Sequence, residues 1–232
     1  TAGVPNQQHV DPRWRWLVKH EPEVIEGTAH LCGSYDFIVH RLTAGWSLEE
    51  NWAVESGLYD IRQRCWHEPY LAHAGIRPDI LPPVRQRAEI VGAITESAAA
   101  QTGLPIGTPV VAGSADHVAA ALASGLTQPG DTLLKFGGGG DILYCTDRDD
   151  PDPHFYVDLH TIPDRWLING CMAASGSFVK WFAAELGNDA SLADLDADAA
   201  TVPPGSDGIV ALPYLLGEKT PIFDPMARGV FA

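Results

Sequence analysis

The sequence predicts a protein of mixed helices and short strands, in the α/β or α+β class. Two observations support this class. In the first half, helix-capping residues flank apolar residues at the spacing of one helix face. From residue 109 onward, short apolar runs alternate with glycine-containing turns, which is typical of strands. The 232 residues, of which 45% are hydrophobic, are enough to bury a sizeable core.

Four helices are predicted before residue 109. Asp11 is expected to cap the first, with Pro12 at its first position. Ser34 is expected to cap the second, which carries the apolar side chains of Phe37, Ile38 and Leu42. The third is expected over 66–74 with Gly75 closing it, and the fourth over 96–102 between Thr95 and Gly103.

The second half starts with a strand over 109–113, followed by Asp116 and an Ala-rich helix over 117–124. A β-hairpin is predicted next, with strands over 132–136 and 141–144 around four consecutive glycines. Two further strands are expected over 155–159 and 166–168. Ser175 and Gly176 open an amphipathic helix, whose inward side chains are expected to be Phe178, Val179, Phe182 and Leu186. A polar helix within 189–200, a strand over 208–212 and a loop over 213–221 follow.

The formal net charge of −15 limits the classes of partner. A nucleic-acid binder needs clustered Lys and Arg, and no such cluster occurs, so we expect no nucleic-acid partner. An anionic membrane surface is disfavoured for the same reason. The sequence also contains no run of 18 apolar residues that could span a bilayer.

The four cysteines contain no CxxC, and the nine histidines are scattered. We therefore expect a reducing cytoplasm, no disulfide framework and no His/Asp metal cluster.

Asp116 is the first candidate for chemistry. It follows the strand over 109–113 at the foot of a helix, and the small residues before it leave room for a ligand. A carboxylate there can accept a proton from a substrate hydroxyl or hold a metal. The alternative is a plain helix N-cap, a role that Asp often fills.

The second candidate is the run Gly137, Gly138, Gly139 and Gly140 between two apolar strands. Four glycines are entropically costly, so a mere spacer explains them poorly. Glycine permits a positive φ and leaves bare amides that can bind an anion. The residues that follow fit neither a Walker loop nor a dinucleotide fingerprint. A phosphate-binding hairpin and a tight structural hairpin both remain open.

The third candidate is the run of small residues over 170–176, which leads into a helix start. A phosphate site at that helix start and simple packing both remain open.

Taken together and in this order, these segments resemble the FGGY family of carbohydrate kinases. The most specific match is Leu-Pro-Tyr-Leu-Leu-Gly-Glu-Lys-Thr-Pro (212–221) with Asp-Pro-Met-Ala-Arg-Gly-Val-Phe (224–231). The segment 109–120 resembles the family's stretch around its catalytic aspartate, and Ser-Gly-Leu-Tyr-Asp-Ile (56–61) also matches. The resemblance covers essentially the whole chain.

The resemblance implies an actin-like, ribonuclease H-like ATPase fold, with ATP and sugar bound between two domains. Residues 1–126 would be the carboxy-terminal part of the sugar-binding domain, and 127–232 the amino-terminal part of the nucleotide-binding domain. The family's first phosphate hairpin and its adenosine-binding segment are not recognisable. We therefore expect this portion to be inactive alone, and its apolar carboxy-terminal half to be exposed and to drive self-association into a homo-oligomer.

The resemblance also implies roles for individual residues. Asp116 matches the general base, and Gly137, Gly138 and Gly139 match the family's second phosphate hairpin, which Gly140 completes. Gly176 matches a nucleotide-contacting glycine, and Lys180 falls where some members contact the nucleotide. ATP and Mg²⁺ are the implied cosubstrate and metal, while no protein metal ligand is assigned.

The chain departs from the family pattern at the hairpin. The family usually has Gly-Thr-Ser or Gly-Thr-Gly there, so a hydroxyl donor is missing at Gly138 and backbone amides would have to bind phosphate. Asp141 stands near a substrate-facing position of some relatives, where it would bind a sugar hydroxyl or simply cap its strand. The aligned opening also suggests Gln8 or His9 near the sugar.

The sequence therefore favours an ATP-dependent kinase for a primary hydroxyl of a ketopentose-like sugar. A polyol kinase acting on glycerol or erythritol is the alternative in the same class. A catalytically incomplete actin-like module is the alternative of another class. A metal-dependent hydrolase is disfavoured because no His/Asp metal cluster is expected.

Overall fold

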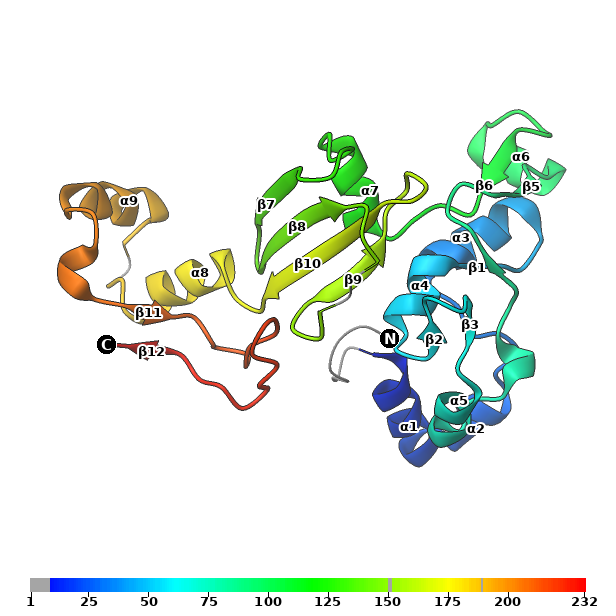
Figure 1. The fold of residues 1–232 in the computed structure, drawn as a ribbon, viewed down its shortest axis with the longest axis horizontal. Coiled ribbons are helices and arrows are strands. Elements are labelled where there is room, and N and C mark those ends of the chain that lie inside the picture. The colour runs from blue at the N-terminus through cyan, green and yellow to red at the C-terminus, as the bar shows by residue number, and fades with distance from the viewer. Residues whose placement is uncertain (1–8, 150–151, 189) are drawn as a thin grey trace. The chain divides into compact units, whose positions relative to one another are not determined.

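The computed structural model describes residues 9–149, 152–188 and 190–232. The described residues form two compact units, one of 9–127 with 158–167 and one of 128–157 with 168–232 (Figure 1). Within the described part, every helix is too short or too polar to cross a bilayer.

The first unit consists of short helices and small two-stranded sheets. Its helices are α1 (Val10–His20), α2 (Pro22–Glu26), α3 (Ser34–Thr43), α4 (Glu50–Glu55), α5 (Glu68–Ala74), the 3-10 helix η1 (Pro78–Ile80), α6 (Glu96–Thr102) and α7 (Asp116–Ala123). Its paired strands are β1 (Leu48–Glu49) with β4 (Val84–Arg85), β2 (Tyr59–Asp60) with β3 (Cys65–Trp66), and β5 (Ile90–Ala93) with β6 (Pro109–Val111). Only the first pair is parallel.

A hydrophobic cluster lies between α1 and α5 and holds this end of the unit together. Trp14 is 4% exposed and packs with Leu58, Leu71, Ala74, Ile76 and Ile80. Its indole N–H donates to the carbonyl of Gly75, whose positive φ ends α5 as predicted. Thr95 caps α6 by accepting from the amide of Ala98, also as predicted.

Helix α3 shows that a polar group, rather than the apolar residues, decides which face is buried. Asp36 is 1% exposed and its two carboxylate oxygens accept from the amides of Gly33 and Glu49. Phe37 and Ile38 are therefore left 47% and 56% exposed. The predicted cap at Ser34 is wrong, because Gly33 is the N-cap and the Asp36 carboxylate bonds its amide.

Two further helix starts differ from prediction. Helix α1 begins at Val10 with His9 as its N-cap, so Asp11 lies in the first turn instead of capping it. The third helix begins at Glu68 and not at Trp66, because Cys65 and Trp66 pair with β2. A hairpin pairing with the strand just before it thus overrides the helix signal at these two residues.

The side chain of Asn51 joins α4 to a strand far away in the sequence. Its Nδ2 donates to the carbonyl of Leu159 at 2.9 Å, and its Oδ1 accepts from the amide of Leu159 at 2.7 Å. Asn51 is fully buried and Leu159 is 7% exposed. The amide side chain thus occupies the place of a neighbouring strand, and both buried backbone groups of Leu159 are satisfied.

The second unit is built on the predicted hairpin. Strands β7 (Thr132–Phe136) and β8 (Gly140–Thr146) pair antiparallel, with Phe136 opposite Gly140. The sheet order is β7-β8-β10-β9, where β9 is Tyr156–Leu159 and β10 is Trp166–Met172, and the division between the units falls within β9 and β10. The remaining elements are α8 (Gly176–Glu185), α9 (Leu192–Thr201), the 3-10 helix η2 (Ser206–Gly208) and the antiparallel strands β11 (Ala211–Leu212) and β12 (Val230–Phe231).

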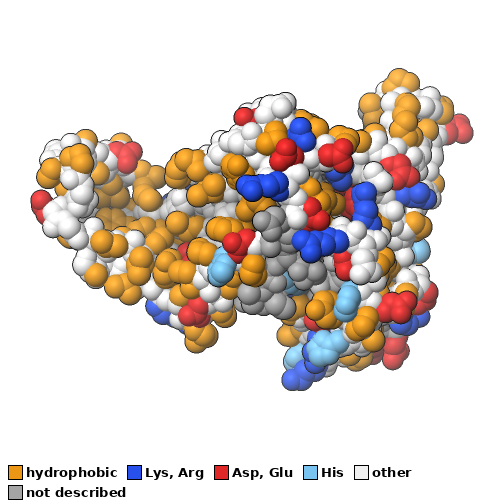
Figure 2. All heavy atoms as spheres, viewed as in Figure 1, with side chains coloured by type: hydrophobic (Ala, Val, Ile, Leu, Met, Phe, Trp, Pro, Cys, Tyr) orange, Lys and Arg blue, Asp and Glu red, His pale blue; other side chains and the backbone are white. Residues whose placement is uncertain are grey.

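The apolar face of α8 is only half covered. Phe178 and Phe182 pack on Phe231 of β12, with ring centroids 5.7 and 6.2 Å apart. Val179 and Leu186, which were expected to point inward, are 47% and 51% exposed. Figure 2 shows hydrophobic side chains gathered over the segment that carries α8, α9 and β11. The exposed apolar surface agrees with expectation, and self-association stays a prediction.

Replacing Asn51 by Ala should destabilise the first unit. Asn51→Ala leaves the buried amide and carbonyl of Leu159 without partners, at a cost of about 3 kcal/mol. Denaturant unfolding measures this loss, and hydrogen exchange at the Leu159 amide should accelerate in parallel.

Gln101→Ala is the matched control, because its side-chain amide bonds only within the exposed face of α6. That variant should lose about 0.5 kcal/mol or less. Equal losses in the two variants would contradict the role assigned to Asn51.

Candidate functional site

Asp116 lies where the predicted strand meets the predicted helix. Strand β6 ends at Val111, the chain turns at Gly113 with φ 93°, and α7 begins at Asp116. Ala112 and Ala115 on either side of the turn are buried, whereas the Asp116 side chain is fully exposed. Its Oδ1 accepts from the amide of His117 at 2.6 Å. The N-cap alternative is wrong, since Ala115 holds that position.

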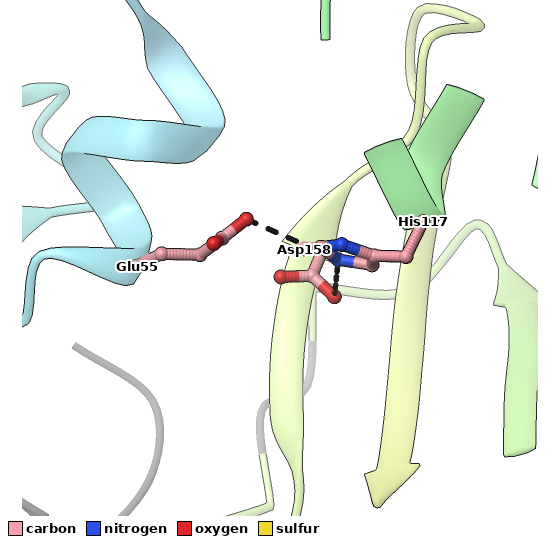
Figure 3. A group of neighbouring side chains, drawn as sticks. All are labelled: Glu55, His117 and Asp158. Atoms are coloured by element: carbon pink, nitrogen blue, oxygen red, sulfur yellow. Dashed lines mark hydrogen bonds and ion pairs between the residues drawn. The ribbon is translucent and has the colours of Figure 1, made fainter. Parts of the chain in front are cut away.

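His117 brings two acidic side chains from distant segments close to Asp116. Figure 3 shows Glu55 at the end of α4 and Asp158 on β9 converging on its ring. His117 Nε2 lies 3.1 Å from Asp158 Oδ2 and 3.9 Å from Glu55 Oε1. His117 Nδ1 lies 3.5 Å from Asp116 Oδ1. We call Glu55, His117 and Asp158 the carboxylate–histidine cluster.

Buried hydrogen bonds fix the elements that carry this cluster. Asn51 and Glu55 are four residues apart on α4, so they lie on the same side of the helix. Because Asn51 is bonded to Leu159, Glu55 lies beside the neighbouring Asp158. On the other side, His160 Nε2 lies 2.7 Å from the carbonyl of Leu126, just after α7.

The electrostatics of the cluster favour a charged histidine. Burial opposes protonation of His117, but the hydrogen bond to Asp158 and the charges of Asp158 and Glu55 outweigh it and raise its pKa to about 9. Burial and the charge of Asp158 raise the pKa of Glu55, while His117 opposes this rise. The Glu55 side chain is 41% exposed and Asp158 only 3%. Asp158 is therefore the better shielded partner of the imidazolium.

The cluster corrects the expectation that no His/Asp grouping exists. One donor atom from each of its three residues lies within 4.8 Å of the others, which is compact enough to surround a cation. A hydrogen bond of 3.1 Å joins His117 Nε2 to Asp158 Oδ2. An ion pair between them accounts for the geometry without a metal. No sequence pattern indicates this cluster, because its members lie on three separate elements.

In the second unit, the glycine hairpin packs directly against the start of α8. The carbonyl of Gly138 accepts from the amides of Ser175 and Ser177 at 2.8 and 3.1 Å, and the Gly137 carbonyl accepts from Gly176 at 2.8 Å. The first amides of α8 are thus used by the hairpin. This favours the packing alternative for residues 170–176 over a phosphate site at the helix start.

Close backbone contacts explain some of the glycines but not all. A Cβ on Gly139 would lie 2.8 Å from the Met172 carbonyl oxygen. A Cβ on Gly176 would lie 2.7 Å from the Gly137 carbonyl oxygen. A Cβ on Gly138 would meet nothing within 4 Å. None of the four hairpin glycines has a positive φ, so left-handed backbone is not the reason for them. Packing within the described residues therefore leaves Gly138 unexplained.

Asp141 forms a cross-strand ion pair at the base of the hairpin. It stands opposite Lys135, whose Nζ is 2.7 Å away. Burial disfavours its charged form, but Lys135, a hydrogen bond with Cys171 and the charge of Lys219 together lower its pKa. The positive charge of Lys135 thus neutralises this carboxylate, and both suggested roles of Asp141, in sugar binding and as a strand cap, stay predictions.

The most specific sequence motif anchors a loop to β10. Glu218 is 7% exposed and its Oε1 accepts from the amide of Ala173 at 2.9 Å. The amide of Cys171 donates to the Thr220 hydroxyl. Residues 218–220 therefore hold the end of β10, which leads into α8 and lies against the hairpin at Gly139.

The other predicted site residues are His9, Lys180 and Gln8. The His9 ring packs against the turn at Gly57, just after Glu55, and burial lowers its pKa. Lys180 is exposed on α8, in the second unit. Gln8 lies outside the described residues. The first unit thus holds Asp116, His9 and the carboxylate–histidine cluster, and the second holds the hairpin, Gly176, Asp141 and Lys180.

Comparisons with known proteins agree on one family. Residues 7–123 match the N-terminal domain of the FGGY family of carbohydrate kinases. The chain is 31% identical to xylulose kinase of Bacillus subtilis over 94% of this chain and 44% of that protein. It is also 31% identical to an autoinducer-2 kinase of Enterobacter sp., over 87% of this chain and 40% of that protein. The chain thus spans less than half the length of these relatives.

Structural comparison gives the same answer. The crystal structure of xylulose kinase from Rhodospirillum rubrum matches with a TM-score of 0.86 and 46% identity, over 98% of this chain and 46% of that one. The helix and strand order described above is therefore that of the actin-like ATPase fold of these kinases, as the sequence resemblance implied. The family match and this structural likeness establish that the chain belongs to the FGGY family of carbohydrate kinases.

Proposed function

We propose that the whole protein transfers a phosphoryl group from ATP to a primary hydroxyl of a ketopentose-like sugar, with Asp116 as the general base. Family membership supports sugar or polyol phosphorylation. The similar proteins named as xylulose kinases make a ketopentose the first substrate to test. The role of Asp116 is supported by its fully exposed carboxylate at the start of α7, next to a glycine turn without side-chain bulk.

Phosphoryl transfer depends mainly on positioning and on neutralising charge, so the protein needs few reacting groups. One carboxylate that accepts the proton of the attacking hydroxyl is sufficient as a base. Oδ2 of Asp116 suits this role because the contacts from His117 fall on Oδ1.

The observation that carries the ATP part of the proposal is the open space at Gly138. Gly138 has neither a positive φ nor a neighbour that excludes a side chain. Among the described residues, the amides of Gly138 and Gly139 donate to no protein group. Bare amides with free space beside them suit a phosphate oxygen, which a side chain at this point would hold away.

Magnesium stays a prediction from family membership. Backbone amides bind anions and not cations, and the carboxylate beside the hairpin, Asp141, is ion-paired with Lys135. The described residues of the hairpin thus do not fit a Mg²⁺ site. Gly176 and Lys180 keep the nucleotide-contacting roles inferred from the resemblance, and Asp141 and His9 keep sugar-binding roles, all as proposals.

Two alternatives remain worth testing. A polyol kinase uses the same chemistry, and a panel of ketoses and polyols distinguishes it. A catalytically incomplete actin-like module would show no sugar-dependent ATP turnover in any such panel. A cytoplasmic location, homo-oligomerisation and the absence of nucleic-acid partners also stay predictions.

Removing the base should abolish most of the turnover. In the complete gene product, Asp116→Asn should lower kcat by about a hundredfold or more, because the amide cannot accept the substrate proton. Sugar-dependent ADP release measures the loss. Asp152→Asn, which changes another exposed carboxylate in the loop before β9, should keep the wild-type rate. Equal rates for Asp116→Asn and wild type would refute the assignment.

A negative charge at Gly138 should weaken ATP binding without unfolding the protein. Gly138→Asp should raise KM for ATP at least about tenfold by charge repulsion at close range, while the melting temperature stays unchanged because the position is open. Steady-state kinetics and thermal melts check both effects.

Two control variants separate charge from shape and fold. Gly138→Asn has the shape of Asp without the charge and should change KM far less. Gly139→Ala should lower the melting temperature, since its Cβ would meet the Met172 carbonyl. A wild-type KM in Gly138→Asp would argue against phosphate binding at the hairpin.

A further inference from the structure

We propose that His117 is a positioning residue, held by Asp158 and Glu55, which orients the carboxylate of Asp116 so that Oδ2 faces the substrate hydroxyl. This inference rests on the proposed function, since it concerns the same base. It adds three residues to the reaction that sequence patterns did not identify.

Both contacts from His117 fall on one oxygen of Asp116. The backbone amide of His117 donates to Oδ1 at 2.6 Å, and ring Nδ1 lies 3.5 Å from the same oxygen. The Asp116 side chain is otherwise fully exposed, so packing does not restrict its rotation. These contacts tether Oδ1 and leave the lone pairs of Oδ2 to accept a proton.

The other side of the ring is anchored by buried structure. His117 Nε2 faces Asp158 Oδ2 at 3.1 Å and Glu55 Oε1 at 3.9 Å. Asp158 is 3% exposed and lies next to Leu159, which Asn51 bonds through both backbone groups. The ring is only 20% exposed, so it has little freedom to turn away. The contacts with Asp158 on β9 and Glu55 on α4 thus hold the His117 ring in place beside Asp116.

A doubly protonated ring matches both contacts. Nε2 is hydrogen-bonded to Asp158 Oδ2, and Nδ1 lies at an ion-pair distance of 3.5 Å from Asp116 Oδ1. Only the imidazolium carries a hydrogen on both nitrogens, so only it can direct an N–H toward each carboxylate. The titratable groups that face the ring are Asp116 on its own helix, Asp158 on β9 and Glu55 on α4. Their charges, against the effect of burial, raise the pKa of His117 to about 9, so the imidazolium persists at neutral pH.

The test compares His117→Gln and Asp158→Asn with wild type in the complete gene product. Both variants should lower kcat by about tenfold to a hundredfold, because a misplaced catalytic group costs rate and not affinity. KM for the sugar and for ATP should change less than about twofold, whereas a defect that distorts the binding sites would raise KM as well.

The pH dependence of kcat gives a second readout. The folded-state pKa of His117, about 9, lies above the ordinary value of 6.5. The ring is therefore fully protonated well below pH 9, and it loses its charge as the pH rises through about 9. Wild-type kcat should fall across that range. This alkaline decrease should be absent in His117→Gln and shifted to lower pH in Asp158→Asn.

An exposed pair provides the matched control. His154 Nδ1 lies 2.7 Å from Asp152 Oδ1, and both side chains are more than half exposed. His154→Gln removes a histidine–aspartate pair outside the proposed site. It should leave kcat and its pH dependence as in wild type.

A spectroscopic measurement keeps the proposal testable if a variant does not fold. With histidine labelled by ¹⁵N in wild type, the ring nitrogens of one residue should both stay protonated up to about pH 9, and this signal should disappear in a folded His117→Gln. A ring that is neutral at pH 7 overturns the inference. So does a response of the ring signals to added Mn²⁺ or Zn²⁺ alone, which would mark a metal site instead.

The outcomes separate this inference from the proposed function. Sugar-dependent turnover in wild type together with unchanged kcat and pH dependence in folded His117→Gln overturns the inference only. No turnover in wild type with any sugar or polyol defeats the proposed function, and the nitrogen spectrum then still decides whether the ring is held as an imidazolium.

Discussion

The geometry around Asp116 depends on the pairing between the Asn51 side chain and the backbone of Leu159. Two short hydrogen bonds, both buried, fix α4 against β9. A buried backbone amide and carbonyl cannot be left without partners except at a cost of several kcal/mol, so this contact has little freedom to shift. The relative placement of Glu55 and Asp158, and through them of His117, follows from it.

Backbone contacts play the same part at the glycine hairpin. Carbonyls of Gly137 and Gly138 receive the first amides of α8, and the absence of side chains at Gly139 and Gly176 lets the two segments approach. Glu218 fixes the strand end from which α8 starts. The first amides of α8 have acceptors in the hairpin, whereas the amides of Gly138 and Gly139 have none among the described residues. The hairpin backbone is thus held in position before an anion binds, and such preorganisation favours anion binding.

Charge is distributed differently in the two units. In the first, Glu55, Asp158 and Asp116 surround one histidine, so the imidazolium balances only part of the negative charge. In the second, Asp141 is balanced by Lys135 beside the hairpin. A neutralised carboxylate there limits repulsion of a phosphate, and an overall charge of −15 is thus compatible with binding a small polyanion.

The sequence by itself determined the family, the hairpin, the ends of several helices and the position of Asp116 at a strand–helix junction, because these depend on residues close together in the chain. It did not determine the buried face of α3 or the start of α5, where Asp36 hydrogen bonds and β2–β3 pairing override local pattern. Nor did it reveal the carboxylate–histidine cluster. Only the tertiary structure decided that, since Glu55, His117 and Asp158 meet through long-range hydrogen bonds that leave no periodic trace in the sequence.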